Sequence, residues 1–141
     1  MAAAPMTVSV VSPERVLFTG EATQVITRTL GTGEIAFLSG HAPFLGALTE
    51  CHTRIYMVDG SVVNVAVHGG FVEVSNNKVN LLSDVAELGD QIDRARALLA
   101  QERAEAVLQR EHDVEAVAAL GRAHARLNAS GGLTGTPAGA H

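Results

Sequence analysis

Aromatic residues are scarce in this chain of 141 residues, which has no tryptophan, one tyrosine and four phenylalanines. Because 47% of the residues are nevertheless hydrophobic, the chain can bury a core, and Val, Leu and Ala must fill it. No hydrophobic run approaches the roughly 18 residues that a membrane-spanning helix needs. The first residues, 1–6, have the pattern of neither a signal peptide nor a mitochondrial leader. We therefore expect a soluble protein without direct membrane insertion.

Cysteine and lysine are equally scarce, since Cys51 is the only cysteine and Lys78 the only lysine. A single cysteine cannot form an internal disulfide, which fits a reducing compartment, and we expect a buried, inert thiol. Residues 1–90 carry nine acidic and four basic groups, whereas the charges of residues 91–141 cancel. A first part with this acidic surplus cannot neutralise phosphates, so we expect no nucleic-acid binding.

Motifs of catalytic and metal sites are also missing. No glycine-rich loop ends in Lys-Ser or Lys-Thr, and no serine or cysteine has an obvious base partner on a shared element. The six histidines lack the spacing of metal ligands; His112 and His124, for example, lie twelve positions apart. The sequence therefore predicts neither a catalytic centre nor a metal site.

The pattern that is present in residues 1–87 is that of a β-domain. Short runs rich in Val, Ile and Thr alternate with turn residues, and no helical pattern interrupts them. Asp59-Gly60 favours a tight type I′ turn between two of the runs, and Asn76-Asn77 tolerates positive φ between two others. Such a series predicts an antiparallel sandwich or barrel. The expected strands are residues 7–11, 16–18, 22–30, 34–38, 53–58, 61–67, 70–74 and 78–85.

A helical hairpin is predicted for residues 88–128, where Ala, Glu, Arg and Gln dominate. Residues 91–110 carry apolar side chains at helical spacing, Asp90 is the expected N-cap, and Asp93 three residues later resembles a capping box. After a short break, residues 114–127 form the expected second helix. A link this short makes the two helices antiparallel neighbours.

Several features indicate that this hairpin is only marginally stable. Its apolar stripe is narrow and rich in alanine, and Gly121 inside the second helix costs roughly 1 kcal/mol relative to alanine. Asp113 is a plausible cap for that helix. Residues 129–141 are rich in Gly, Ser, Thr and Pro, so we expect them to form a disordered tail.

A set of motifs follows in a fixed order along residues 6–110. They are Val11-Ser12-Pro13-Glu14-Arg15 with Leu17-Phe18-Thr19-Gly20-Glu21-Ala22, then Gly33-Glu34-Ile35 with Gly40-His41-Ala42-Pro43, then His68-Gly69-Gly70-Phe71-Val72-Glu73-Val74 with Asn77-Lys78-Val79, and finally Asp84-Val85-Ala86-Glu87 with Ile92-Asp93. Each motif is weak by itself, but in this order they resemble the epsilon subunits of bacterial F-type ATP synthases.

The resemblance implies a β-sandwich of about ten strands followed by two α-helices. It also implies a non-catalytic rotor subunit of the central stalk, which couples proton-driven rotation to ATP synthesis. Its partners would be the gamma subunit and the ring of c subunits, at the cytoplasmic face of the bacterial inner membrane. The helical hairpin would leave rotation free when folded against the sandwich, and would block ATP hydrolysis when extended into the catalytic alpha/beta head.

Two groups of loop residues resemble the region of the family that faces the c ring. One is the loop with Gly31, Gly33 and Glu34, and the other is the turn with His41 and Pro43. Glycine and proline at these positions could equally serve only to form turns.

Some bacterial members of the family bind ATP at the hairpin through a pattern Ile/Leu-Asp-x-x-Arg-Ala, which this chain matches. Asp93 and Arg96 are three apart and share a helix face, and Arg103 follows seven positions later. Arg122 and Arg126 could close the site from the second helix or, in the extended state, approach the catalytic subunit, and the arginine fork suits phosphate oxygens. The matching residues are Ile92, Asp93, Arg96 and Ala97.

Alternatives to this interpretation come from the same residues. Asp93 could act only as a cap, and the arginines could pair with Glu102, Glu105 or Glu115. No cofactor is required in either case, and ATP would be a regulatory ligand. A second function class is a free-standing ATP-sensing β-sandwich module with a helical lid.

Overall fold

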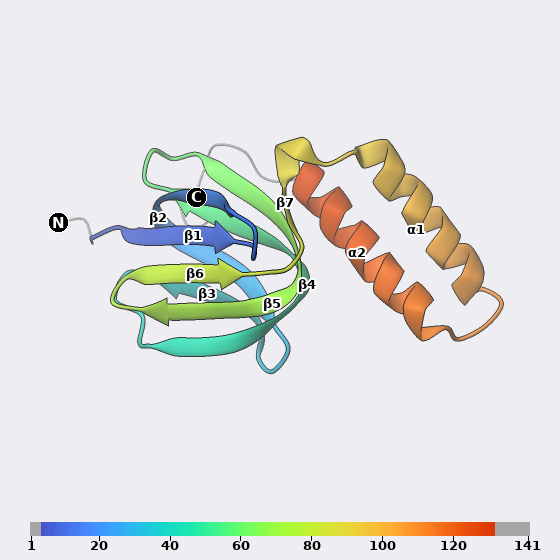
Figure 1. The fold of residues 1–141 in the computed structure, drawn as a ribbon, viewed down its shortest axis with the longest axis horizontal. Helices are drawn as coiled ribbons and strands as arrows, with labels where there is room; N and C mark the ends of the chain where they lie inside the picture. Colours follow the sequence, from blue (N-terminus) through green and yellow to red (C-terminus); the bar gives the residue numbers. More distant parts are fainter. Residues whose placement is uncertain (1–3, 132–141) are drawn as a thin grey trace.

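The computed structural model describes residues 4–131, which form a β-domain with two helices against one end (Figure 1). This confirms a β-rich first part followed by two C-terminal helices. Residues 132–141 of the predicted tail lie outside the described residues. The strands are β1 (Met6–Val11), β2 (Val16–Thr29), β3 (Gly33–Leu38), β4 (Phe44–Met57), β5 (Val62–Ser75), β6 (Lys78–Leu82) and β7 (Ala86–Leu88); η1 (Gly89–Gln91), α1 (Arg94–Leu108) and α2 (Val114–Ser130) follow.

The described residues contain seven strands, so the expectation of about ten is wrong. The strands β2, β4 and β5 each have 14 residues, and sequence reading divided two of them at internal glycines. In β5 the expected strands 61–67 and 70–74 leave a break at His68-Gly69, whereas the observed strand is continuous there. Gly69 and Gly70 have φ of 93° and 110°. A Cβ atom on Gly70 would overlap the backbone of Leu82 on β6, so this glycine allows a close strand approach within a continuous strand.

The strand order is β1-β6-β5-β4-β2-β3, with β7 paired to β5. β1 also pairs with β2, through partners such as Val10 and Phe18, and this pairing closes the sheet on itself. The prediction of an antiparallel domain holds for every pair among the described strands except β1 and β6, which are parallel.

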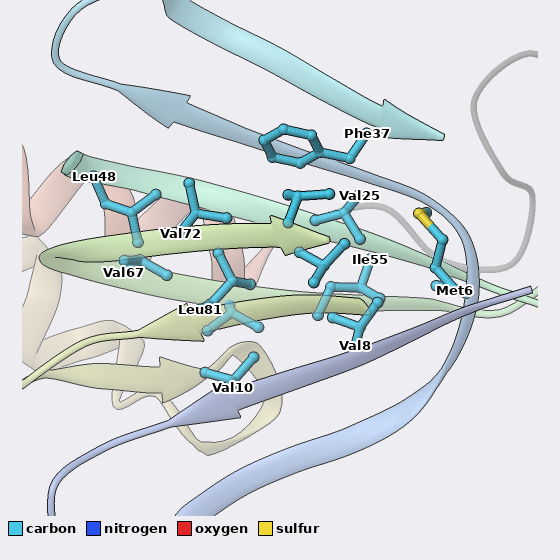
Figure 2. Packing of buried hydrophobic residues seen from close by; sticks show 14 of the residues in the cluster. Met6, Val8, Val10, Val25, Phe37, Leu48, Ile55, Val67, Val72 and Leu81 are labelled. Atoms are coloured by element: carbon cyan, nitrogen blue, oxygen red, sulfur yellow. The ribbon is translucent and has the colours of Figure 1, made fainter. Parts of the chain in front are cut away.

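The core lies inside the closed sheet and consists mostly of aliphatic side chains from every strand except β7 (Figure 2). In β5 the buried positions change phase, from Val65 and Val67 to Val72 and Val74, on either side of the two glycines. This change lets one long strand face the core along both of its halves. Cys51 is buried, as expected, beside the hydroxyl of Thr27.

Both predicted β-turns are present. Asp59-Gly60 connects β4 to β5, but only Gly60 has positive φ, so the expected type I′ geometry is absent there. Asn76 and Asn77, between β5 and β6, both have positive φ, at 51° and 57°. Asn77 also accepts a hydrogen bond from the backbone of Gly40 at 2.7 Å, which ties this turn to the loop before β4.

The helices differ from the expected ones at their ends. Asp93, not Asp90, caps α1, because its carboxylate accepts the Arg96 amide at 3.1 Å while Asp90 lies in η1. Asp113 caps α2 as predicted, accepting the Ala116 amide at 2.9 Å. α2 then continues to Ser130, so positions 129 and 130 belong to the helix and not to the tail.

The two helices form an antiparallel hairpin in which α2 packs against β4, β5 and β7 (Figure 1). α1 packs against α2, on the side away from the sandwich. Within residues 4–131, neither helix combines the length and the hydrophobicity that crossing a bilayer requires.

Candidate functional site

A cleft of about 430 Å³ lies where the start of α1, the end of α2 and β7 meet. It gathers six of the seven residues predicted for nucleotide binding and adds one acidic side chain, Glu87, from β7. Its lining residues are Glu87, Gln91, Ile92, Asp93, Arg96, Ala97, Ala100, Arg103 and Arg126.

α1 supplies two guanidinium groups to the cleft. Arg96 and Arg103 lie two turns apart on one helix face, and both are exposed. Neither forms a salt bridge with another described residue, so the predicted alternative of pairing with Glu102 or Glu105 is not formed. Two free guanidinium groups facing one cleft are suited to bind phosphate or carboxylate oxygens.

Asp93 and Ala97 have structural roles at the same place. The Asp93 carboxylate caps α1, which fixes where the helix begins and hence where Arg96 points. Ala97 is buried and lines the cleft. Both of the predicted explanations for Asp93 are therefore compatible, because a carboxylate that caps a helix keeps further acceptor positions.

Arg126 closes the cleft from α2 and is held by Glu87. The distance from Arg126 Nε to Glu87 Oε1 is 2.7 Å, and the same oxygen lies 3.1 Å from Nε2 of His68. Burial by itself would raise the pKa of Glu87, but the hydrogen bonds and charges of Arg126 and His68 lower it below its ordinary value of 4.5. Glu87 is therefore ionised at neutral pH.

Sequence reading missed Glu87 as a site residue. It lies in the motif Asp84-Val85-Ala86-Glu87, but its partner Arg126 is 39 positions away, and no local spacing connects the two. The only signal was its position directly before the helical segment.

Arg122 is the predicted residue that does not line the cleft. Its Nη2 atom donates to Glu115 Oε1 at 2.6 Å, and its Nη1 atom lies 3.8 Å from Glu50 Oε1 on β4. The predicted pairing with Glu115 is therefore formed, and Arg122 is directed toward the sandwich.

The contact between α2 and the sandwich is small in its apolar part. Ala66 of β5 packs with Ala125 and Ala129 of α2, and Ile92 covers their edge. Around this cluster the contact is polar, through Arg126 with Glu87 and Arg122 with Glu50. The hairpin is thus attached by alanine side chains and partly exposed ion pairs, both of which stabilise weakly.

The loop residues predicted to face a c ring lie at the two ends of β3. Gly31 is in the turn before this strand, Gly33 and Glu34 begin it, and Glu34 pairs with Arg54 at 3.0 Å. His41 and Pro43 follow the strand. The His41 ring packs edge-on against Phe37, with 4.9 Å between the two ring centroids. A flat partner surface would reach both groups only if it lay along β3.

The described residues contain no cluster of three or more His, Cys, Asp or Glu side chains that could hold a metal ion.

Comparison with known proteins shows to which family this architecture belongs. Residues 5–89, which include all seven strands, match the family described as "ATP synthase, Delta/Epsilon chain, beta-sandwich domain". The chain belongs to this ATP synthase delta/epsilon family. The resemblance inferred from the ordered motifs is thereby confirmed.

Relatives in the family are similar over most of their length. The ATP synthase epsilon chain of Streptomyces coelicolor is 44% identical over 124 residues, covering 85% of this chain and 99% of the relative. That of Desulfitobacterium hafniense is 44% identical over 131 residues, covering 91% and 98%. That of Synechococcus elongatus is 42% identical over 134 residues, covering 91% and 96%.

Two solved structures share the fold. One is a chain of the Euglena gracilis mitochondrial ATP synthase (OSCP/F1/c-ring), with a TM-score of 0.77 at 20% identity, covering 92% of this chain and 83% of that chain. The other belongs to the central stalk and c ring of the Tetrahymena thermophila mitochondrial ATP synthase, with a TM-score of 0.54 at 14% identity, covering 93% and 97%. At these identities the likeness shows the fold alone.

Proposed function

We propose that this chain is a non-catalytic central-stalk subunit of a proton-translocating F-type ATP synthase. It couples rotation to ATP synthesis, and its helical hairpin restrains ATP hydrolysis. The observation that carries the proposal is the family membership, with relatives named ATP synthase epsilon chain that match almost from end to end. Its partners are the gamma subunit and the c ring, which hold it at the cytoplasmic face of the bacterial inner membrane.

The surface of the sandwich supports a role as a binding partner. Phe71 of β5 and Leu82 of β6 are register partners, and the two residues are 55% and 41% exposed. Leu45 of β4 is exposed on a neighbouring strand. Large apolar side chains gathered on one surface are typical of a docking face, and the gamma subunit is the proposed occupant.

The hairpin supports the regulatory part of the proposal. Its docked position depends on three alanines and two partly exposed ion pairs, so a second position requires only a few kcal/mol of compensating contacts. In the extended position the catalytic alpha/beta head supplies those contacts. Arg122 and Arg126, released from Glu50 and Glu87, are the groups proposed to meet acidic residues there.

The test is ATP hydrolysis by the assembled complex with the full chain and with a chain truncated after Leu88, which keeps all seven strands. We expect hydrolysis to rise several-fold after truncation, while the gamma subunit still co-purifies with the truncated chain. Unchanged hydrolysis with gamma still bound would reduce the hairpin to a structural strut. Failure of the full chain to co-purify with gamma would refute the stalk assignment and favour the free-standing ATP-sensing module.

We further propose that the cleft at the hairpin binds ATP as a regulatory ligand. The free guanidinium groups of Arg96 and Arg103 and the nearby Arg126 support this. A ligand that binds only the docked hairpin stabilises it by RT ln(1 + [L]/Kd). Calorimetry should show at least about tenfold weaker ATP binding for Arg96→Ala, the loss expected for one charged hydrogen bond.

Arg110→Ala is the matched control, because Arg110 is exposed beyond the end of α1 and does not line the cleft. Its affinity should equal that of the unaltered chain. Equal affinities for all three proteins would remove Arg96 from the site.

A further inference from the structure

His68 is a titratable side chain buried under the docked hairpin. It lies on β5 one position before the two glycines, on the same side as Ala66, against which α2 packs. Its side chain is only 3% exposed. Movement of the hairpin away from the sandwich would therefore expose this imidazole to water.

The hydrogen-bonding of the His68 imidazole defines which of its protonation states fits the docked state. A carboxylate can only accept, so the 3.1 Å contact with Glu87 Oε1 places the imidazole proton on Nε2. Nδ1 is buried and meets no hydrogen-bonding group of residues 4–131. A second proton on Nδ1 would create a buried donor without an acceptor, which is unfavourable.

The charges around the imidazole come from each element packed against it. β7 contributes Glu87 and α2 contributes Arg126 and Arg122, while Glu50 is its register partner on β4. Burial lowers the pKa of His68 below the ordinary value of 6.5; the hydrogen bond to Glu87 opposes this, and the two arginines of α2 add to the lowering. The docked hairpin thus holds the neutral imidazole in two ways, by covering it and by bringing positive charge to it.

We propose that protonation of His68 weakens the docking of the hairpin, so that acidification shifts the chain from the docked toward the undocked form. The inference rests on the proposed function in one respect, namely that the hairpin has an undocked form. It adds a proton as a regulator, and it assigns His68 as the group that senses it.

The direction of the pH effect follows from the linkage between docking and protonation. The undocked form exposes His68 and moves the two arginines away, which raises its pKa toward the ordinary value, so this form binds more protons than the docked form. Docking is fully favourable above pH 6.5 and weakens as the pH falls from 6.5 toward the lowered pKa of the docked state. Within that window one linked proton changes the docking equilibrium constant by up to about tenfold per pH unit.

His52 is a second histidine whose protonation should weaken the docking of the hairpin. It lines a cleft beside Gly121 and Ala125 of α2, and its Nε2 atom is 2.7 Å from Asn64 Oδ1. Burial lowers its pKa too, while the hydrogen bond to Asn64 opposes the change, and the charge of Arg54 adds to the lowering. A residual pH dependence after replacement of His68 is therefore assigned by replacing His52 as well.

The experiment measures the distance between two spin labels in the full chain by pulsed electron paramagnetic resonance. The labels are placed at Val58→Cys, on the turn before β5, and at Val114→Cys, at the start of α2, because both sites are exposed; Cys51→Ser removes the native thiol. Samples between pH 5.5 and 8.0 avoid the range in which Glu87 titrates. The docked fraction should fall as the pH is lowered.

His68→Gln keeps a donor for Glu87 but cannot be protonated, so the fall should be lost or reduced to the His52 contribution. His112→Gln is the control, because His112 is exposed between the helices, and it should titrate like the unaltered chain. A titration for His68→Gln equal to that of the unaltered chain would overturn the proposal, as would a docked fraction independent of pH in the unaltered chain.

A further variant separates this outcome from failure of the proposed function. Ala125→Asp places a charge in the buried contact between α2 and Ala66, and it should populate the undocked distance at every pH. If it does so while His68→Gln still titrates normally, only the proton sensor is wrong. If no undocked distance is seen even with Ala125→Asp, the mobile hairpin itself is refuted.

Discussion

Among single residues, Glu87 joins three elements that are distant in sequence. One of its oxygens accepts from Arg126 on α2 and from His68 on β5, so a single carboxylate links the hairpin, the sandwich and the candidate nucleotide cleft. Its lowered pKa means that the docked state gains from the ionised form above about pH 4.5 and loses that gain as the pH falls through the lowered value. Protonation of Glu87 therefore weakens docking at a lower pH than protonation of His68 does.

Replacing Glu87 with Gln should weaken the docking of α2 without unfolding the sandwich. The charge-assisted bond to Arg126 becomes a neutral one, and since both groups are partly exposed, the expected loss is about 1 kcal/mol. Hydrogen exchange of α2 amides should become about fivefold faster, while exchange in β4 stays unchanged. Glu115→Gln, which affects only an exposed pair within α2, is the control and should leave exchange nearly unchanged. Equal effects of the two variants would contradict the special role of Glu87.

Among the elements, α2 decides how the hairpin sits. Gly121 faces Glu50, and a Cβ atom there would lie 2.5 Å from the Glu50 Oε2 atom. Gly89 in η1 faces the end of α2, and a Cβ atom there would overlap the Ala129 carbonyl. One glycine therefore meets a movable side chain, and the other meets a fixed backbone.

The two glycines should respond to alanine in opposite directions. Gly121→Ala should stabilise α2 by up to about 1 kcal/mol, because helix propensity improves and the Glu50 carboxylate can rotate away. The 3.8 Å contact that Glu50 makes with Arg122 is partly exposed, so its loss offsets only a small part of this gain. Gly89→Ala should weaken docking, because only a shift of the whole helix relieves the overlap. Hydrogen exchange of α2 measures both effects, as slower exchange in the first variant and faster exchange in the second. A change in the same direction for both would show that side-chain mobility does not decide the outcome.

At the scale of the whole molecule, the two parts do not share a core. The large cluster inside the closed sheet contains residues of the strands only, while the hairpin contacts the sandwich through a separate cluster around Ala66. We therefore expect the sandwich to fold without the helices.

A chain ending at Leu88 should consequently unfold in one cooperative thermal transition, measured by circular dichroism. Its midpoint should lie within a few degrees of that of the full chain, because truncation removes only the small alanine contact and two ion pairs. Loss of the cooperative transition would show that the hairpin is part of the folding unit.

The sequence by itself determined the local features of this protein. Alternating Val and Ile runs gave strands, Asn76-Asn77 gave a turn with two positive φ values, and Asp113 gave a helix start, because each depends on neighbours a few positions away. The ordered motifs also sufficed to predict the family. Asp93 and Asp90 were harder to separate, since both satisfy the same local capping rule and only the η1 turn distinguishes them.

Tertiary structure alone decided the features that depend on distant residues. Gly70 is a point of close strand approach because Leu82 of β6 lies beside it. Arg126 reaches the cleft and Arg122 does not, because Glu87 and Glu50 come from different strands under the same helix. His68 is buried among side chains of β7 and α2 that are far from it in the sequence. Electrostatics and burial act through space, and how the hairpin docks sets the pairing of residues as distant in sequence as Glu50 and Arg122.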